Sequence, residues 1–228
     1  MAKDLSGKRI LITSGPTRAN IDAVRYISNR SSGRLGCRIA IEALALGARV
    51  TVIAGPESAV PGKDELSREE WERLRVIPIE TVYDLLQAME KELTAHERYD
   101  AVVHAMAVLD YVPEKEESGK VSSRKQSWTL RLVRTPKVIQ QIKVWSPRTF
   151  LVGFKLEVGK SEERLREIGT AAMRQNRADL VVVNDLTKIH DEEHPAIILG
   201  AGGAVLSSPR TKSEIARELC RILAHALA

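Results

Sequence analysis

The sequence is poor in the features that mark several common protein classes. It has only two cysteines, Cys37 and Cys220, and both lie in stretches with helical periodicity. This argues against a secreted disulfide scaffold and predicts two buried thiols. No apolar run approaches the roughly 18 residues that span a bilayer. Residues 1–6 are charged and lack the apolar core of a signal peptide, so we expect a cytoplasmic protein that does not bind membranes.

Aromatic residues and clusters of one charge are also scarce. Aromatics make up 4% of the chain, which leaves few platforms for stacking a single nucleic-acid strand. The net charge is +5, but basic and acidic residues are interspersed, as in the stretch 67–73. We therefore expect no nucleic-acid partner, and the mild positive excess fits small polyanionic ligands.

The length of 228 residues suits one domain, residues 1–228, around a single core. Short β-branched runs alternate with stretches of helical periodicity, which predicts an α/β fold with a doubly wound, mostly parallel sheet. The expected strands are 8–14, 49–54, 75–79, 99–105, 150–154 and 178–183, and the expected helices are 36–46, 82–93, 162–175 and one that starts at Ser213.

Three segments depart from this alternation. About twenty residues separate the first strand from its helix, where a few would be usual, and long loops of this kind tend to be functional. A polar excursion covers about 112–134, with an edge strand expected at 128–133 and Pro136 opening the next helix. A late β-hairpin is expected through 195–206, turning at 200–203.

Ligands of open α/β sheets bind beyond the carboxyl ends of the strands. Small and polar residues gather at these ends in the stretches 14–17, 55–56, 105–111, 153–155 and 184–185. Neither the three-glycine dinucleotide fingerprint nor a P-loop is present. Instead Ser31, Ser32 and Gly33 precede the first helix, where free N–H groups and the helix dipole favour an anion. The alternative is that Ser31 or Ser32 is only a helix cap and Gly33 a turn residue.

Several of these stretches together resemble one family. The segments 17–25 and 27–33, followed by 106–111, 120–123, 153–156 and 184–185, look like the phosphopantothenoylcysteine synthetase family, also called phosphopantothenate–cysteine ligase. The resemblance covers nearly the whole chain and implies a Rossmann-like fold, Mg²⁺ dependence and a homodimer formed through the excursion. No flavin-dependent decarboxylase region precedes the matched segments, so the chain resembles the stand-alone bacterial type. A separate phosphopantothenoylcysteine decarboxylase is then an expected partner.

The resemblance also implies a reaction in two steps. The carboxylate of 4′-phosphopantothenate attacks the α-phosphate of CTP and releases pyrophosphate, and the amine of cysteine then displaces CMP from the acyl-cytidylate. A carboxylate is a poor acyl donor, whereas a mixed phosphoric anhydride has a good leaving group. Catalysis is then mostly positioning and neutralisation of charge.

Residue roles follow from the same resemblance. Asn29 and Lys120 match the catalytic residues, with Asn29 on the pantothenate portion and Lys120 in a mobile segment that closes over the triphosphate. The backbone groups of Ala105 and Ala107 would read the base edge. The nucleotide-binding set is Gly15, Ser31, Ser32, Gly33, Ala105, Ala107, Asp110, Phe154 and Lys155, and the substrate-binding set is Asn29, Arg30, Asn184 and Asp185.

Each of these residues also has a structural interpretation. Asn29 suits a turn, Lys120 is one surface lysine among many, Asp110 suits a strand-end cap, and Phe154 suits the core. Asn184 and Asp185 together form a common turn, and their alternative role is to support a phosphate or a metal.

Two departures from the family pattern bear on function. Leu109 stands where a small residue is expected, and Ser122 and Ser123 replace lysines of many bifunctional relatives. They leave the choice between CTP and ATP open. Two rival functions also remain. One is a nicotinamide-dependent reductase, although the sequence lacks the glycine fingerprint and the Tyr-x-x-x-Lys pair of such enzymes. The other is a homologue that binds the ligands but no longer catalyses the reaction.

Overall fold

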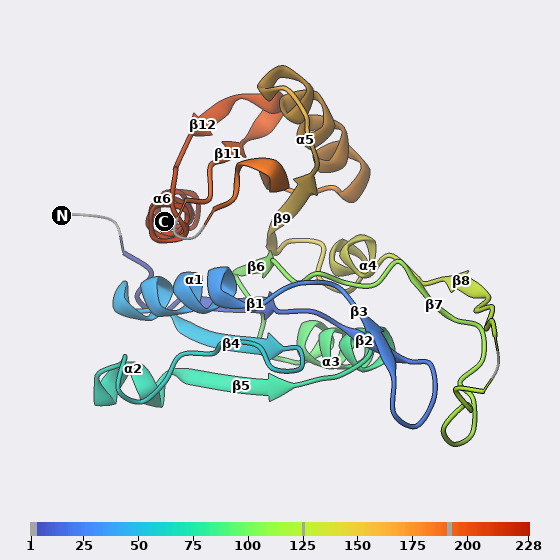
Figure 1. Ribbon diagram of the computed structural model, residues 1–228. Coiled ribbons are helices and arrows are strands. Elements are labelled where there is room, and N and C mark those ends of the chain that lie inside the picture. Colours follow the sequence, from blue (N-terminus) through green and yellow to red (C-terminus); the bar gives the residue numbers. More distant parts are fainter. Residues whose placement is uncertain (1–3, 125, 191–192) are drawn as a thin grey trace.

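The computed structural model describes residues 4–124, 126–190 and 193–228. An eight-stranded sheet runs through the molecule in the order β12-β11-β10-β9-β6-β1-β4-β5 (Figure 1). Its parallel strands are β1 (Arg9–Ser14), β4 (Arg49–Ala54), β5 (Leu74–Pro78), β6 (Ala101–His104), β9 (Phe150–Glu157) and β10 (Leu180–Asp185). Read from β5 to β10, this is the strand order of the Rossmann fold, which confirms the predicted fold class.

The late hairpin adds two antiparallel strands at one edge of the sheet. They are β11 (Ala196–Leu199) and β12 (Val205–Ser207). The Gly200 N–H donates to the Ala204 carbonyl oxygen at 2.9 Å and closes the turn, as the sequence predicts.

Helices cover both faces of the sheet because successive strand residues point to opposite sides. On one face, α1 (Arg34–Ala45) and α6 (Lys212–Ala226) pack on Ile10, Ile12 and Val103. On the other, α3 (Val82–Thr94), α4 (Val138–Trp145) and α5 (Glu162–Asn176) pack on the side that holds Leu11 and Val102. Each of these side chains is fully buried, and each such burial is worth roughly 1.5–3 kcal/mol.

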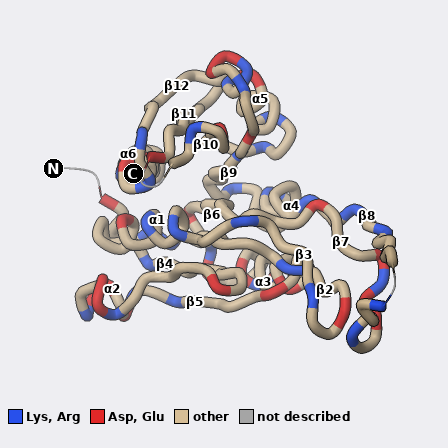
Figure 2. The backbone as a smooth tube through the Cα atoms, viewed as in Figure 1, with Lys and Arg blue, Asp and Glu red and all other residues tan. Residues whose placement is uncertain are grey.

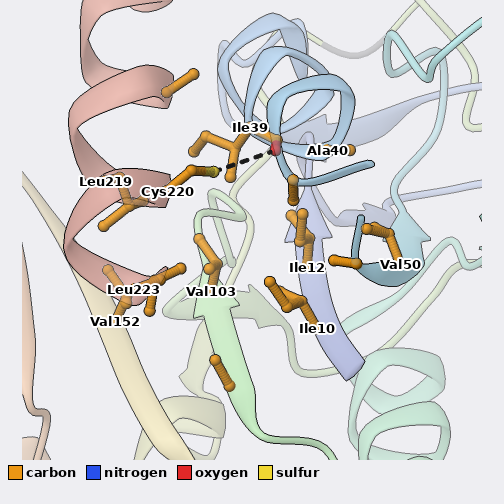
Figure 3. Close-up of a cluster of buried hydrophobic side chains, with 14 of the residues drawn as sticks. Ile10, Ile12, Ile39, Ala40, Val50, Val103, Val152, Leu219, Cys220 and Leu223 are labelled. Carbon is orange, nitrogen blue, oxygen red and sulfur yellow. Dashed lines mark hydrogen bonds between the residues drawn. The ribbon is translucent and has the colours of Figure 1, made fainter. Parts of the chain in front are cut away.

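Both cysteines are buried free thiols, as predicted from their helical positions. The Cys220 Sγ lies 3.8 Å from the Ile39 carbonyl oxygen, between α6 and α1 (Figure 3). Burial raises the pKa of Cys37 to about 11 and raises that of Cys220 further. Neither thiol is therefore activated as a nucleophile at neutral pH.

Short elements in the loops correct several sequence predictions. The long loop after β1 folds as a hairpin of β2 (Arg18–Asn20) and β3 (Tyr26–Ser28). In the excursion, β7 (Tyr111–Pro113) pairs with β8 (Leu132–Arg134) in a sheet of their own, so the predicted edge strand 128–133 does not join the main sheet. Both hairpins project from the side of the molecule toward which β1 and β5 point (Figure 1).

Two helix starts also differ from expectation. Lys137 is the N-cap of α4, so Pro136 lies before the cap and not in the first turn. The helix α2 (Arg68–Glu72) was not predicted, because its residues are exposed and carry no apolar stripe. A reciprocal cap between Ser67 and Glu70 fixes its start.

Within the described ranges, no helix is both long enough and apolar enough to cross a membrane. Lys and Arg are interspersed with Asp and Glu along the backbone trace (Figure 2).

Candidate functional site

The candidate site lies where the strand order reverses, at the carboxyl ends of β1 and β6. The loops that leave these strands run side by side, because Pro16 and Ala107 form a parallel bridge. The Ala107 N–H donates to the Gly15 carbonyl oxygen at 2.8 Å, and the Thr17 N–H donates to the Ala107 carbonyl oxygen at 3.3 Å. Open α/β sheets bind ligands at this reversal point, and we call the region beside these two loops the crevice.

Asn29 joins the β2–β3 hairpin to this crevice. Its Nδ2 donates to the carbonyl oxygens of Ala107 and Val108, at 3.1 Å each. The side chain is exposed, and no donor in the described part of the chain reaches its Oδ1. Asn29 is thus held by its amide nitrogen while its oxygen stays available to a ligand.

The backbone of Ala107 is more occupied than predicted. Its N–H bonds to Gly15, and its carbonyl oxygen accepts from both Thr17 and Asn29. This corrects the expectation that Ala107 leaves its backbone free to read a base. Ala105 donates its N–H to the Thr13 carbonyl oxygen at 3.1 Å, so its carbonyl group is what it could offer a ligand.

Glycines allow two close approaches at the end of β1, one by Ser58 and one by the start of α1. Gly15 has a φ of 82°, and a Cβ there would lie 1.6 Å from Ser58 Oγ. A Cβ at Gly36 would lie 2.2 Å from Ser14 Oγ, which donates to the Gly33 carbonyl oxygen at 3.0 Å. The first turn of α1 therefore packs directly against the end of β1.

The cap of α1 differs from the predicted alternative. Gly33, with a φ of 70°, is the N-cap, and no side chain caps the helix, so neither Ser31 nor Ser32 has that role. Cys37 makes the bond to the Gly33 carbonyl oxygen, at 3.0 Å, which leaves the N–H groups of residues 34–36 without an intrahelical partner. Nearby, the buried Ser58 Oγ has no hydrogen-bond partner among the described residues. This end of α1 has the donors and the dipole that an anion needs.

We expect Gly15→Ala to destabilise the protein by on the order of 3 kcal/mol, because it adds a left-handed strain to a clash with Ser58. Gly7→Ala is the matched control, since Gly7 has a φ of 76° but open space at its Cβ, and the strain alone costs roughly 1 kcal/mol. Urea unfolding of both variants measures the difference. Equal losses would mean that the close approach of Ser58, in the loop after β4, to Gly15 does not contribute to stability.

Asp110 and Lys137 form the charged rim of the crevice. Lys137 Nζ lies 2.6 Å from Asp110 Oδ1, and both side chains are substantially exposed. The pair places the Lys137 cation beside the predicted nucleotide site. Sequence reasoning missed Lys137, because it lies 27 residues from Asp110.

Leu109 belongs to the core and not to the crevice surface. Its side chain is 5% exposed and packs in the cluster below α3 and α4. Its N–H donates to Thr17 Oγ1 at 3.0 Å, and its carbonyl oxygen accepts from Thr135 Oγ1 at 2.7 Å. The unusual leucine is therefore accommodated by burial.

Phe154 and Lys155 lie on β9, next to β6. The strand register pairs His104 with Gly153, which puts Phe154 level with Ala105 at the crevice end. Phe154 is half-buried against the α1–α6 core, and Lys155 Nζ pairs with Glu157 Oε1 at 3.0 Å. Phe154 is thus in part a core residue, as its structural interpretation expects.

His104, the last residue of β6, does not provide acid–base chemistry. Its Nδ1 lies 2.8 Å from Thr13 Oγ1, between two central strands. Burial lowers the pKa of His104 to about 4, so the ring is neutral at physiological pH. It links β1 to β6 beneath the crevice.

Asp185 has a structural role that fits its alternative interpretation as a turn residue. It is 1% exposed, and its carboxylate accepts the N–H groups of Gly159, Lys160 and Thr187 at 2.6–2.9 Å. Both oxygens are therefore occupied by the protein. Asn184 Nδ2 lies 2.9 Å from His194 Nε2, and β10 is separated from β6 by β9. Asp185 therefore stabilises a turn at the end of β10, and the structure does not bring it to Asn29.

A pH dependence of stability follows from Asp185. Burial alone would raise its pKa, but the N–H groups of Thr187 and Gly159, the Thr187 hydroxyl and the Lys160 N–H outweigh it and lower the pKa. The stabilisation is complete above the unfolded pKa of about 3.9 and is lost as pH falls toward the folded value. We expect Asp185→Asn to be less stable than the unaltered protein at pH 7, with a gap that shrinks below about pH 4. Denaturant unfolding from pH 7 to pH 3 measures the gap, and a constant gap would contradict this role; the exposed Asp64→Asn is the control.

Lys120 lies in the excursion and is exposed, with no ion pair in the described part of the chain. The turn of the β2–β3 hairpin binds the backbone on both sides of Lys120. The Ala23 N–H donates to the Gly119 carbonyl oxygen at 3.4 Å, and the Val121 N–H donates to Asp22 Oδ2 at 3.1 Å. The fold therefore brings the Lys120 segment to the hairpin that carries Asn29.

Among the described residues, no group of three or more His, Cys, Asp or Glu side chains is arranged to hold a metal ion. Asp110 is the carboxylate at the crevice rim, and it is paired with Lys137. A divalent cation at this site would take most of its ligands from the phosphates of a bound nucleotide, as Mg²⁺ commonly does.

The strand order makes this an α/β protein with a Rossmann-like fold, and an uncapped helix start at the reversal point is an arrangement that many phosphate- and nucleotide-binding proteins share. The profile of the family described as "DNA/pantothenate metabolism flavoprotein C-terminal domain" matches residues 5–227, and the chain belongs to that family. This confirms the resemblance found in the sequence.

Curated relatives point the same way. The chain is 41% identical over 217 residues to the coenzyme A biosynthesis bifunctional protein CoaBC of Thermococcus kodakarensis, covering 95% of this chain and 51% of that protein. The corresponding protein of Bacillus subtilis is 32% identical over 182 residues, covering 80% and 41%. The chain thus spans about half, or less, of the length of these relatives.

Solved structures share the fold over nearly the full chain. The DNA/pantothenate metabolism flavoprotein of Streptococcus pneumoniae superposes with a TM-score of 0.83 at 32% identity, covering 93% of this chain and 96% of that one. The C-terminal domain of a CoaBC protein gives 0.78 at 29% identity, covering 99% and 98%. A Cab2 mutant solved in complex with phosphopantothenate-cysteine gives 0.72 at 21% identity, covering 97% and 89%, and shares the fold.

Proposed function

We propose that this chain is a ligase of coenzyme A biosynthesis that joins 4′-phosphopantothenate to cysteine. The observation that carries the proposal is the Asn29 side chain, anchored across the crevice beside an uncapped helix start. Membership of the pantothenate-metabolism family and the similarity to CoaBC proteins support it.

The proposed chemistry activates a carboxylate with CTP. A carboxylate oxygen of 4′-phosphopantothenate forms a bond to the α-phosphorus of CTP, and the bond to pyrophosphate breaks. The cysteine amine then attacks the acyl carbon, CMP leaves, and the amine gives up a proton as the amide forms. Neither step needs an oxidant or a reductant.

The crevice residues would act by positioning and by neutralising charge. The N–H groups at the start of α1, with Ser31, Ser32 and Gly33, would bind phosphate oxygens. Asn29 would hold the substrate carboxylate away from the Ala107 and Val108 carbonyl oxygens while its Oδ1 accepts from the pantothenate portion. Lys120 would stabilise the charge that develops on the transferring phosphoryl group.

The remaining roles are proposals of the same kind. Asp110 would contact the ribose, Phe154 would stack its exposed part on the pyrimidine, and Lys155 and Arg30 would add positive charge near the phosphates. Mg²⁺ would enter with the triphosphate and offset its negative charge. The family resemblance favours CTP over ATP.

We also propose that the chain forms a homodimer through its two hairpins. Val24, Tyr26, Tyr111 and Leu132 are exposed on them, at 43–61%. Such apolar side chains gathered on projecting hairpins are typical of an interface between subunits. Light scattering should give twice the chain mass of 25.3 kDa, and a monomer would contradict the proposal.

The function is tested by product formation. The chain is incubated with 4′-phosphopantothenate, cysteine, Mg²⁺ and either CTP or ATP, and 4′-phosphopantothenoylcysteine is measured by mass spectrometry. We expect product with CTP and little with ATP. Nucleotide binding without product would favour a binding homologue, and tight NADPH binding without CTP binding would favour a reductase.

A further inference from the structure

The turn of the β2–β3 hairpin holds a buried carboxylate that the proposed chemistry does not use. Asp22 is 2% exposed. Its Oδ1 accepts the N–H groups of Val24 at 2.9 Å and Arg25 at 2.8 Å, which closes the turn. Its Oδ2 accepts the N–H of Val121 at 3.1 Å, a residue 99 positions away. Oδ1 thus closes the hairpin turn, and Oδ2 binds the excursion as well as the Arg25 side chain.

These contacts fix the backbone on both sides of Lys120. Val121 is bound to Asp22, and Gly119 accepts from the Ala23 N–H at 3.4 Å. Arg25 Nη2 adds a bond to the Val121 carbonyl oxygen at 3.2 Å. The Lys120 side chain itself is exposed, so nothing buried in the core holds it. Its place relative to Asn29 is set by the hairpin turn.

The carboxylate form of Asp22 is the one that makes these bonds. Burial alone would raise its pKa, but the N–H groups of Val24, Val121 and Arg25 and the charge of Arg25 outweigh it and lower the pKa. Arg25 Nη1 lies 3.2 Å from Asp22 Oδ2. Hydrogen bonds to a charged acceptor are stronger than those to a neutral one.

We propose that Asp22 is a positioning residue for Lys120: it holds the segment 119–121 on the β2–β3 turn so that the lysine reaches the phosphate end of the crevice. The inference rests on the proposed function. Asp22 touches neither substrate nor nucleotide in this scheme, and it acts through the backbone of Val121.

Asp22→Asn separates the two tasks of the carboxylate. The amide keeps one acceptor oxygen, which can still close the turn with Val24 and Arg25. Its NH₂ group then faces the Val121 N–H and the Arg25 guanidinium, so that donors oppose each other. We expect kcat to fall about 10- to 100-fold, the loss expected for a hydrogen bond to a charged group, while KM for 4′-phosphopantothenate changes little.

A double-mutant cycle with Lys120→Ala tests the mechanism. If Asp22 acts through Lys120, Asp22→Asn will slow the Lys120→Ala enzyme no further. The same fold-loss in both backgrounds would overturn the inference and leave the proposed function standing. Asp100→Asn is the matched control, because Asp100 also accepts a backbone N–H, that of Arg9 at 2.8 Å, at the opposite end of the strands.

Hydrogen exchange gives a readout that does not depend on activity. We expect the Val121 amide to be protected in the unaltered protein and to lose at least about tenfold of its protection in Asp22→Asn or, if that variant does not fold, in Asp22→Ser. Unchanged exchange would overturn the inference. Absence of any ligation by the unaltered chain would overturn the proposed function and this inference with it, so the two failures are distinct.

Discussion

Asn29→Asp should lower the rate of ligation by about 100- to 1,000-fold, the range seen when one preorganised donor is lost from a reacting centre. The new carboxylate would meet the carbonyl oxygens of Ala107 and Val108, which now lie 3.1 Å from the amide nitrogen. It would also place a like charge beside the carboxylate of 4′-phosphopantothenate. Steady-state assays with saturating CTP measure the loss.

The effect on stability should be small, because the Asn29 side chain is exposed and can turn toward solvent. We expect a loss of about 1 kcal/mol or less in the free energy of unfolding. Asn20→Asp adds the same charge to an exposed position on the same hairpin and should leave turnover unchanged. Near-normal ligation by Asn29→Asp would remove the role assigned to this residue.

Lys120→Ala should slow turnover about 100-fold, because a cation on the transferring phosphoryl group is lost in the transition state. Its side chain is exposed and has no ion pair among the described residues, so the free energy of unfolding should change by less than about 0.5 kcal/mol. Rapid-quench measurement of pyrophosphate release separates this step from product release.

Lys115→Ala is the control for Lys120→Ala, since Lys115 lies in the same excursion and is also exposed. It should retain normal turnover. A Lys120→Ala protein that unfolds, or one that binds CTP weakly but turns over normally at saturation, would contradict a role in the transition state.

The core of the fold could be predicted from the sequence because it follows from local patterns. Buried parallel strands appear as short β-branched runs such as 49–54, and Gly47 marks the end of α1 with a φ of 95°. The alternation of these runs with helices restricts the topology to few choices, and the Rossmann order is among them.

The β2–β3 hairpin could not be predicted because each of its strands is only three residues long and includes polar side chains. Neither Arg18–Asn20 nor Tyr26–Ser28 shows an alternating pattern. Their stability comes from contacts made elsewhere, such as the Asp22 bond to Val121. No local signal reports a partner 99 residues away.

In the candidate site, too, local patterns could be predicted and distant contacts could not. Gly33 and the start of α1 were expected at the end of β1 from the position of a loop before a helix, and Gly33 accepts a hydrogen bond from Ser14, the last residue of β1. The backbone donors of Asp185 could not be predicted, because a strand-end Asn-Asp pair looks the same whether its carboxylate faces a ligand or three backbone N–H groups. Which donors a carboxylate meets depends on loops that the sequence does not place.

The most direct test of the account is a pyrophosphate measurement under single-turnover conditions, without cysteine. The proposed mechanism predicts that enzyme, CTP, Mg²⁺ and 4′-phosphopantothenate release about one pyrophosphate per active site, and that cysteine then permits continuous turnover with one CMP for each product. Asn29→Asp should lack the burst. No pyrophosphate release before or after cysteine is added would contradict an acyl-nucleotidyl ligation in this crevice.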